Sequence, residues 1–179
     1  MRRIAWGVGV CALLLGCRES PDHRDQADTR PSFPTIGSTP PRIALPPFDS
    51  TKSGLVLDEE RGHVVVLAYW ATWCGPCVEE MPELSRLAER YRDQGLRVYA
   101  VIHDDDPATA AKWMRAHDVE LPLLLDPGKH AWQAYQARGL PTAYVIARDG
   151  TLWHRQEGYE GPGHWEPRLQ AALAGRPSA

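Results

Sequence analysis

The segment Trp73-Cys74-Gly75-Pro76-Cys77 decides how this sequence is interpreted. It follows the apolar run His63–Trp70, which is typical of a buried strand, and precedes a stretch with apolar residues at helical spacing. Cys74 is therefore expected where a strand ends and a helix begins, at the positive end of the helix dipole, which favours a thiolate. Cys77 lies three residues later on the same helix face and could close a disulfide. The segment predicts a reversible dithiol.

Strand and helix patterns alternate on both sides of this segment. The sequence predicts strands at residues 54–57, 63–70, 96–102, 121–125, 142–147 and 152–157, and helices at residues 74–91, 107–117 and 129–138. A last helix is expected to carry Trp165, Leu169 and Leu173 on its inner face. Asp149-Gly150 between the last two strands is a strong hairpin signal. The alternation predicts an α/β domain with a mixed β-sheet flanked by helices.

Residues 1–16 have the pattern of a secretory signal. A positively charged start, Met1-Arg2-Arg3, precedes the apolar run Ile4–Gly16, which is too short to span a bilayer comfortably. The run ends in Leu14-Leu15-Gly16-Cys17, which resembles a bacterial lipobox with Cys17 as the lipidated first residue. We expect a lipid anchor on the periplasmic side of a bacterial membrane. By resemblance to enterobacterial sorting, Arg18 in place of an aspartate after the cysteine favours the outer membrane. A plain cleaved signal and an uncleaved anchor are the alternatives.

Residues 17–50 differ in composition from the rest of the chain. Seven of the 16 prolines lie there among few apolar residues, so we expect a lipid-attached, Pro-rich tether. Residues 51–179 are enough for one compact domain. Loss of the leader would remove Arg2 and Arg3 and lower the formal net charge of −3 by two. A negative charge argues against nucleic acid as a partner.

Three motifs resemble those of the TlpA/ResA group of membrane-tethered, extracytoplasmic thiol-disulfide oxidoreductases. They are Ala71-Thr72-Trp73-Cys74-Gly75-Pro76-Cys77, Glu80-Met81-Pro82 and Gly139-Leu140-Pro141-Thr142. The predicted helix at residues 107–117 resembles the insert that distinguishes this group from plain thioredoxin. The resemblance implies a thioredoxin fold with this extra strand–helix insert, over roughly residues 45–173. It also implies that a redox-active Cys74–Cys77 disulfide serves in place of a bound cofactor.

Glu80 is the candidate proton acceptor for the second cysteine. Plain thioredoxins carry a buried acid six residues before the first cysteine, a position that Ala68 occupies here. Glu80 follows Cys77 by one helical turn and matches the glutamate characteristic of the TlpA/ResA group. Partial burial would raise its pKa and let it exchange a proton with Cys77 near neutral pH. Glu79 is expected to be a solvated surface charge, and an exposed acid is the alternative interpretation of Glu80.

The resemblance also suggests three substrate-binding residues. Trp73 would be an exposed indole that shields the disulfide and offers a docking surface, with an ordinary core position as the alternative. Pro141 corresponds to a cis-proline that faces the disulfide, although most X–Pro bonds are trans. Leu140 would offer its backbone to an extended substrate strand.

The expected activity is reduction of protein disulfides. Cys-Gly-Pro-Cys is the motif of thioredoxin, whose reduction potential is about −270 mV, against about −120 mV for the oxidant DsbA. By resemblance, the substrates are cysteines of apocytochrome c or thiols of a copper-delivery protein. The electrons would come from a membrane transporter of the DsbD or CcdA kind.

Two other classes of function compete with this interpretation. A metallochaperone could hold a soft ion such as Cu(I) on the same cysteine pair. However, the copper-carrying Sco group spaces its cysteines differently and adds a distant histidine, for which His103 is the only candidate here. A thiol peroxidase of the redoxin group would need a peroxidatic cysteine in a Thr-rich loop, and the CxxC motif argues against it. Zinc is not expected, because no second cysteine or histidine pair completes four ligands.

Overall fold

We obtained a computed structural model of the chain, which describes residues 34–178. The predicted signal, Cys17 and the first half of the predicted tether lie outside the described residues. Among the described residues, no helix is long and apolar enough to cross a membrane.

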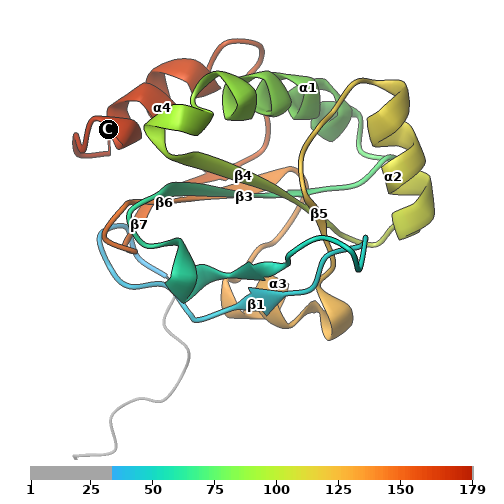
Figure 1. Cartoon of the computed structure of the whole chain (residues 1–179), viewed down its shortest axis with the longest axis horizontal. Helices are drawn as coiled ribbons and strands as arrows, with labels where there is room; N and C mark the ends of the chain where they lie inside the picture. Colours follow the sequence, from blue (N-terminus) through green and yellow to red (C-terminus); the bar gives the residue numbers. More distant parts are fainter. Residues whose placement is uncertain (1–33, 179) are drawn as a thin grey trace, which may run out of the picture. The chain divides into compact units, whose positions relative to one another are not determined.

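A five-stranded mixed sheet forms the centre of the domain (Figure 1). Its strands are β3 (Val64–Trp70), β4 (Leu96–Ile102), β5 (Leu123–Leu124), β6 (Thr142–Ile146) and β7 (Leu152–Glu157). Their order across the sheet is β5-β4-β3-β6-β7, with β3, β4 and β5 parallel and β6 and β7 antiparallel to them. Every residue of β3 is buried, because elements cover both faces of the sheet. The predicted mixed sheet is confirmed.

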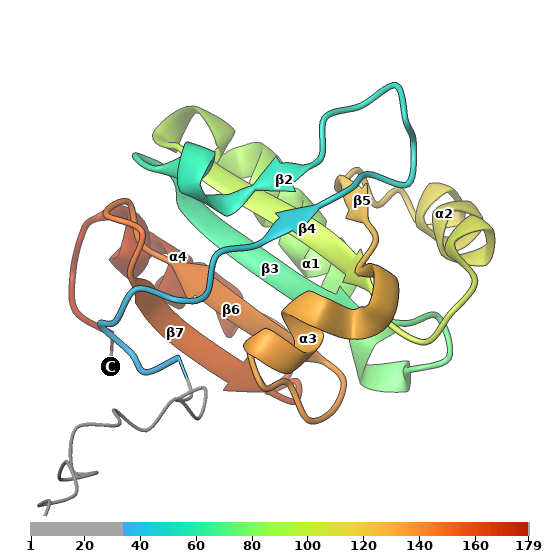
Figure 2. The same ribbon diagram turned by 90° about the horizontal axis from the view of Figure 1, so that it is seen from below.

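Alternate residues of β3 point into two separate cores. Val64, Val66 and Ala68 pack with α1 (Gly75–Arg90), α2 (Pro107–Ala116) and α4 (Trp165–Leu173). Val65, Leu67 and Tyr69 pack on the other face with α3 (His130–Ala134) and with two short strands, β1 (Ala44–Leu45) and β2 (Leu55–Val56). Figures 1 and 2 show α1 and α4 together on one side of the sheet and α3 and β1 on the other. This period of two is that of a strand buried on both faces.

Two predicted end signals are confirmed by side-chain hydrogen bonds. The Asp106 carboxylate caps α2 by accepting from the Thr109 backbone N–H at 2.8 Å. The hairpin between β6 and β7 turns at Gly150, which has a φ of 81°, and the Asp149 carboxylate accepts from the Thr151 backbone N–H. The helix that carries Trp165 and Leu169 on its buried face is also confirmed as α4.

The helix predicted at residues 129–138 is shorter than expected. A 3-10 turn at Pro127–Lys129 comes first, and the α-helix covers only His130–Ala134. Gly128, Lys129 and Gln136 have positive φ values, so the backbone cannot continue a right-handed helix through either end. The predicted end at Gly139 was wrong for this reason.

The strand predicted at residues 54–57 is present but shorter, and it does not belong to the central sheet. Its central residues form β2, which pairs only with β1, antiparallel, in a two-stranded sheet of its own. Leu57 then begins a 3-10 helix, Leu57–Glu60, that leads toward β3. The short pair lies against the central sheet through Leu45 and Leu55, which are both buried.

Residues 34–50, which we call the N-terminal strap, pack on the domain where a free tether was expected. The Leu125 backbone N–H donates to the Pro46 carbonyl, and the Phe48 N–H donates to the Leu123 carbonyl, both at 2.9 Å. The Tyr135 hydroxyl donates to the Pro41 carbonyl at 3.0 Å. The domain thus begins before the expected boundary at residue 50. The prolines of the strap do not prevent it from packing on the domain, because their carbonyls still accept hydrogen bonds.

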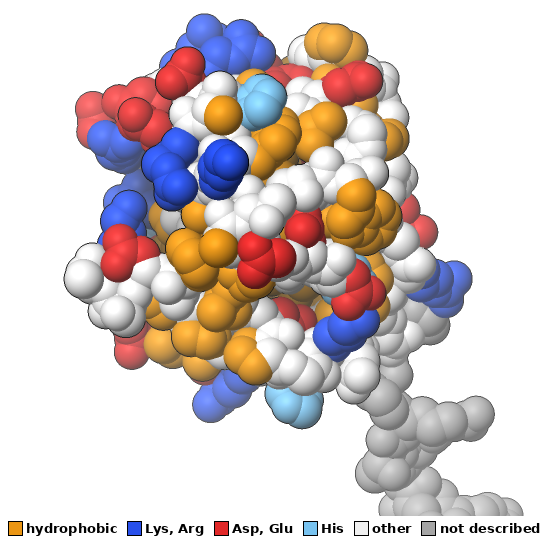
Figure 3. All heavy atoms as spheres, turned by 90° about the vertical axis from the view of Figure 1, so that its right-hand side faces the viewer, with side chains coloured by type: hydrophobic (Ala, Val, Ile, Leu, Met, Phe, Trp, Pro, Cys, Tyr) orange, Lys and Arg blue, Asp and Glu red, His pale blue; other side chains and the backbone are white. Residues whose placement is uncertain are grey.

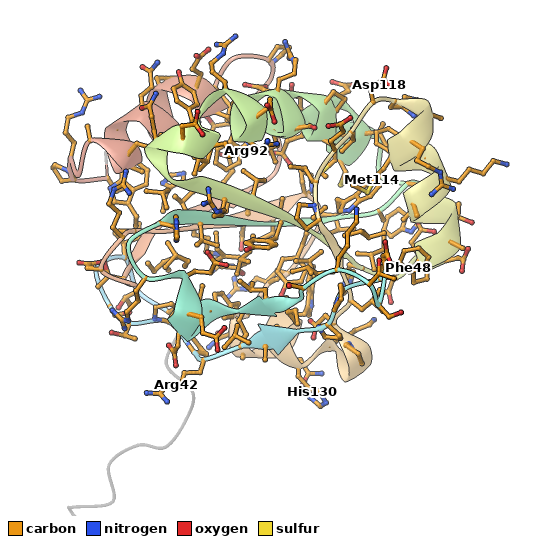
Figure 4. The ribbon with its side chains drawn as sticks, viewed as in Figure 1. Arg42, Phe48, Arg92, Met114, Asp118 and His130 are labelled. Carbon is orange, nitrogen blue, oxygen red and sulfur yellow. A yellow bond between two sulfur atoms is a disulfide. The ribbon has the colours of Figure 1, made fainter. Side chains whose placement is uncertain are left out.

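The end of the strap borders a groove beside α2. The groove has a volume of about 770 Å³ and is lined in part by Phe48, Met114 and Leu121. Phe48 and Met114 are labelled on this side of the molecule in Figure 4. Figure 3 views the same end of the molecule and shows hydrophobic side chains gathered among charged ones. In Figure 1, β3 leads into α1 at this end.

Candidate functional site

Cys74 and Cys77 form a disulfide at the start of α1. Their sulfurs are 2.03 Å apart and their Cα atoms 5.2 Å apart. Cys74 is the N-cap residue of α1, and its Sγ accepts from the Cys77 backbone N–H at 3.3 Å. The Cys74 residue is 6% exposed, whereas Cys77 is 0% exposed. Of the two cysteines, Cys74 thus keeps a small exposed surface, whereas Cys77 is fully enclosed.

Asp105 holds the loop that leads into the disulfide. Its Oδ2 accepts from the Thr72 backbone N–H at 2.7 Å and from the Thr72 hydroxyl at 2.5 Å. These bonds tie the loop after β3 to the loop after β4. Asp105 was not among the predicted site residues, although polar residues directly after two neighbouring parallel strands meet at the same sheet edge.

Trp73 is an exposed aromatic side chain next to the disulfide. It is 63% exposed, so the core alternative for this residue was wrong. Its indole Nε1 donates to the Asp104 carbonyl at 2.9 Å, which fixes the ring against the loop after β4. An oriented, exposed indole gives a partner protein a large apolar contact beside Cys74.

Glu80 is buried in the core beneath the disulfide, one helical turn after Cys77. It is 1% exposed, so the surface-charge alternative was wrong. Burial raises the pKa of Glu80 from 4.5 to about 7, the Trp165 hydrogen bond opposes this rise, and the Glu83 carboxylate adds to it. Glu79 is exposed, as expected. Ala68 is buried in β3 between Ala100 and Ala143, so no acid lies at that strand position.

The Leu140–Pro141 peptide bond is cis, as expected from the resemblance. Pro141 is buried directly before β6, and its carbonyl accepts from the Gly158 backbone N–H at 2.8 Å. Leu140 is half-buried and packs against both cores. The Thr142 hydroxyl donates to the Gly139 carbonyl at 2.7 Å and closes the turn before β6.

His103 is the histidine that could have served a metal site. Its ring stacks on Trp132, with ring centroids 3.7 Å apart, and burial lowers its pKa. Within residues 34–178, no group of three or more His, Cys, Asp or Glu side chains could hold a metal ion. His103 therefore has an aromatic partner rather than a set of co-ligands.

The sequence is similar to those of known protein families and curated proteins. Residues 36–155 match the AhpC/TSA family. The chain belongs to the AhpC/TSA family. It is 27% identical over 135 residues to thiol-disulfide oxidoreductase ResA of Bacillus cereus, a match that covers 75% of this chain and 77% of the relative. It is 29% identical over 116 residues to ResA of Bacillus subtilis, covering 65% of this chain and 64% of the relative.

A solved structure with the same fold supports the similarity to thiol-disulfide oxidoreductases. The crystal structure of a proposed thiol:disulfide interchange protein DsbE from Chlorobium tepidum is 30% identical to this chain. The likeness covers 79% of this chain and 99% of that one, with a TM-score of 0.70. The thioredoxin fold and the resemblance to the TlpA/ResA group are thereby confirmed. This member of the AhpC/TSA family is a thiol-disulfide oxidoreductase whose redox pair is Cys74 and Cys77.

The start of α4 completes the surroundings of the buried acid in this AhpC/TSA chain. The Trp165 indole Nε1 donates to Glu80 Oε1 at 2.8 Å, and His164 Nε2 lies 4.0 Å from the same oxygen. Trp165 was expected on the inner face of the last helix, and its contact with Glu80 was not predicted. The two residues are 85 positions apart, and no spacing rule links them.

Proposed function

We propose that this protein is an extracytoplasmic, membrane-tethered reductant of protein disulfides. The observation that carries the proposal is the asymmetry of the redox pair. Cys74 lies at a helix start and keeps a small exposed surface, whereas Cys77 is enclosed and followed by the buried Glu80. This arrangement suits an attacking thiolate in front of a resolving thiol that has its own proton acceptor.

The reaction has two exchange steps. The Cys74 thiolate attacks one sulfur of a substrate disulfide, forms a mixed disulfide and releases the other substrate sulfur as a thiolate. Cys77 then loses its proton to the Glu80 carboxylate and attacks the Cys74 sulfur. This step forms the Cys74–Cys77 disulfide and releases the second substrate thiolate. Two electrons pass from the cysteine pair to the substrate, and the released thiolates take protons from water.

Trp73, Leu140 and Pro141 are proposed to bind the substrate. The exposed indole would cover one side of the mixed disulfide. The half-buried Leu140, directly before the cis-proline, would pair its backbone with an extended substrate segment. Recognition through a backbone pairing suits a protein or peptide disulfide better than a small molecule.

The proposed partners lie outside the cytoplasm. Apocytochrome c cysteines or the thiols of a copper-delivery protein would be the substrates, and a membrane transporter of the DsbD or CcdA kind would re-reduce the Cys74–Cys77 disulfide. A lipid on Cys17 would hold the chain on the periplasmic side of a bacterial membrane, and the strap would begin the folded part. Mass spectrometry of the membrane fraction should find a lipidated Cys17 peptide that is lost in Cys17→Ser. An unmodified chain free in the periplasm would contradict the anchor.

The reduction potential of the Cys74–Cys77 pair tests the direction of electron flow. Equilibration with glutathione redox buffers should give a value closer to the about −270 mV of thioredoxin than to the about −120 mV of DsbA. The reduced protein should also reduce insulin disulfides, and Cys74→Ser should not. A potential near that of DsbA would make the protein an oxidant and contradict the proposal.

Two control measurements address the competing functions. Metal content after purification tests the metallochaperone, because a Cu(I) carrier should retain the soft ion on its reduced cysteine pair. Consumption of hydrogen peroxide without an external dithiol donor tests the thiol peroxidase. We expect neither stoichiometric metal nor peroxide turnover at a rate comparable to insulin reduction.

A further inference from the structure

His164 is the N-cap residue of α4, and its side chain lies beside the buried acid Glu80. Its side chain is 8% exposed, and its Nε2 is 4.0 Å from Glu80 Oε1, whose own side chain is 2% exposed. The ring also packs at an angle on Trp165, with ring centroids 5.0 Å apart. Since Trp165 donates to the same carboxylate oxygen, that oxygen is directed toward the start of α4. The acid on α1 and the imidazole on α4 thus face each other.

The contacts of the ring determine which nitrogen can exchange a proton. Nδ1 lies 2.6 Å from the Gly161 carbonyl oxygen, which can only accept, so Nδ1 carries a hydrogen. In the neutral ring Nε2 is then the acceptor. Nε2 is also the nitrogen that faces Glu80, so a proton that leaves this carboxyl can be taken up without a change at Nδ1.

Gln156 supplies the hydrogen bond that the neutral ring needs. Its amide nitrogen is 2.9 Å from His164 Nε2 and 3.1 Å from the Gly158 carbonyl oxygen. The opposite amide orientation would place two acceptor oxygens against each other, so the nitrogen must face both groups. The Gln156 amide oxygen is buried without a hydrogen-bond partner. His164 Nε2 therefore has two possible partners, the Gln156 donor when neutral and the Glu80 carboxylate when protonated.

Other charged groups near His164 come from four elements. On α1, the Glu83 carboxylate accepts from the Gly163 backbone N–H at 3.1 Å. In the loop after β7, Glu160 pairs with Arg168 of α4 at 2.7 Å, and Tyr159 contacts the His164 ring. On β7, His154 has its pKa lowered mainly by burial, with Arg168 as a further cause. Arg168 is thus paired with Glu160, and Glu80 is a carboxylate that lies within 4.0 Å of Nε2.

We propose that His164 supports the exchange reaction indirectly, through Glu80. It takes up from the Glu80 carboxyl the proton that Cys77 has released and passes this proton to solvent. The inference rests on the proposed thiol-disulfide exchange. A separation of 4.0 Å is about 1 Å too long for a hydrogen bond, so the transfer requires a small ring movement or one bridging water molecule. Glu80 is regenerated as carboxylate, the ring becomes an imidazolium, and loss of the Nε2 proton to solvent restores the neutral ring.

The decay of a mixed disulfide measures this step. Reduced protein is mixed with oxidised glutathione, aliquots are alkylated, and the Cys74–glutathione adduct is quantified by mass spectrometry. His164→Gln cannot carry a proton and should slow the decay roughly tenfold between pH 6 and 8, less than the ~10²-fold expected for loss of the acid itself. The difference should vanish at alkaline pH, where Cys77 ionises unaided. In a Glu80→Gln background, His164→Gln should add no further loss, because both residues serve one proton transfer.

His117→Gln is the matched control. The His117 ring also has Nδ1 2.8 Å from a backbone carbonyl and stacks on a tryptophan, Trp113, but it belongs to the end of α2. His164→Asn is a second variant that retains a donor toward Gly161. Unchanged decay in folded His164→Gln or His164→Asn, or a loss that adds fully to that of Glu80→Gln, would overturn the relay. Wild-type protein that keeps both cysteines reduced in oxidised glutathione, or that forms an adduct that never decays, would overturn the exchange function and the relay with it.

Discussion

The Trp165 indole donates a 2.8 Å hydrogen bond to the Glu80 carboxylate from a helix on the far side of the buried acid. Both residues are fully enclosed, so the carboxylate is oriented and kept from bulk water. The pKa of Glu80 is raised to about 7 because burial outweighs this hydrogen bond. An acid that titrates near neutral pH can both accept and release a proton under physiological conditions.

Glu80→Gln should slow the resolving step while leaving the first attack by Cys74 unchanged. We expect a loss of ~10²-fold near neutral pH, because the amide cannot accept the Cys77 proton. Above the pKa of the Cys77 thiol, the resolving rates of wild type and Glu80→Gln should become equal. Stopped-flow oxidation of the reduced proteins across pH 5–10 measures both steps. Glu79→Gln, one residue away and exposed, is the control, and equal rates for all three proteins would return Glu80 to a structural role.

Trp165→Phe should move the pH dependence of the same step. The indole hydrogen bond favours the carboxylate form of Glu80 and lowers its pKa, so its loss should raise this pKa above 7. The midpoint of the rising rate should shift upward by about one to two pH units, since a hydrogen bond to a charged group contributes about 1.5–3 kcal/mol. Trp153→Phe removes a comparable bond, from Nε1 to the Arg176 carbonyl, and should leave the midpoint unchanged. If the pH midpoint shifted equally in both variants, the Trp165 hydrogen bond would not be what sets the pKa of Glu80.

Glu80 should also make the stability of the protein depend on pH. Its pKa in the folded protein lies near 7, above the ordinary 4.5 expected in the unfolded chain. The contribution of protonated Glu80 to the free energy of unfolding is thus fully present below pH 4.5 and is lost as pH rises through 7. The free energy of unfolding of wild type relative to Glu80→Gln should fall by roughly 3 kcal/mol over this range. Urea unfolding of the oxidised proteins at pH 4.5, 6 and 8 gives this difference, which should stay flat if Glu80 is not buried in solution.

Elements with strong local signals were predicted from the sequence. β4 and β7 have the predicted bounds, because their apolar or alternating runs are closed by glycine and aspartate turns. α2 begins at the predicted cap, because Asp106 and Pro107 act on their own helix. The cysteine pair was likewise predicted, since a strand, a CxxC motif and a helical stripe follow one another directly along the chain.

Features that depend on distant contacts were not predicted. The strap contains prolines and few apolar residues, and part of its docking depends on the Pro46 carbonyl and the Phe48 N–H, which pair with Leu125 and Leu123. Composition does not reveal such backbone pairing. In the site, Trp165, His164 and Asp105 act through partners far along the chain, so only the folded arrangement shows their roles.

Leu45→Ala should destabilise the protein although it lies in the segment expected to be a tether. Leu45 is buried against Leu55 and the central sheet, so its truncation leaves a cavity that costs about 2–4 kcal/mol. Ile36→Ala, at an exposed position of the same strap, should change stability by less than about 0.5 kcal/mol. Thermal or urea unfolding compares the two variants. Equal stabilities would show that the strap does not pack on the domain in solution.

Cys77→Ser should trap mixed disulfides with substrates, whereas Cys74→Ser should trap few. The reason is the difference in exposure: Cys74, at the N-cap of α1, keeps a small exposed surface, and Cys77 has none. With Cys77 replaced, the bond formed by Cys74 has no resolving thiol and persists through non-reducing electrophoresis.

The same asymmetry can be measured without a substrate. In the reduced wild-type protein, brief alkylation at mildly acidic pH should label Cys74 first, because the helix start favours its thiolate and Cys77 is not accessible. Peptide mapping identifies the labelled residue, and prolonged alkylation in denaturant should label both cysteines as a control. Faster labelling of Cys77, or adducts that accumulate mainly in Cys74→Ser, would reverse the roles of the two thiols and would remove the reason for a proton acceptor at Glu80.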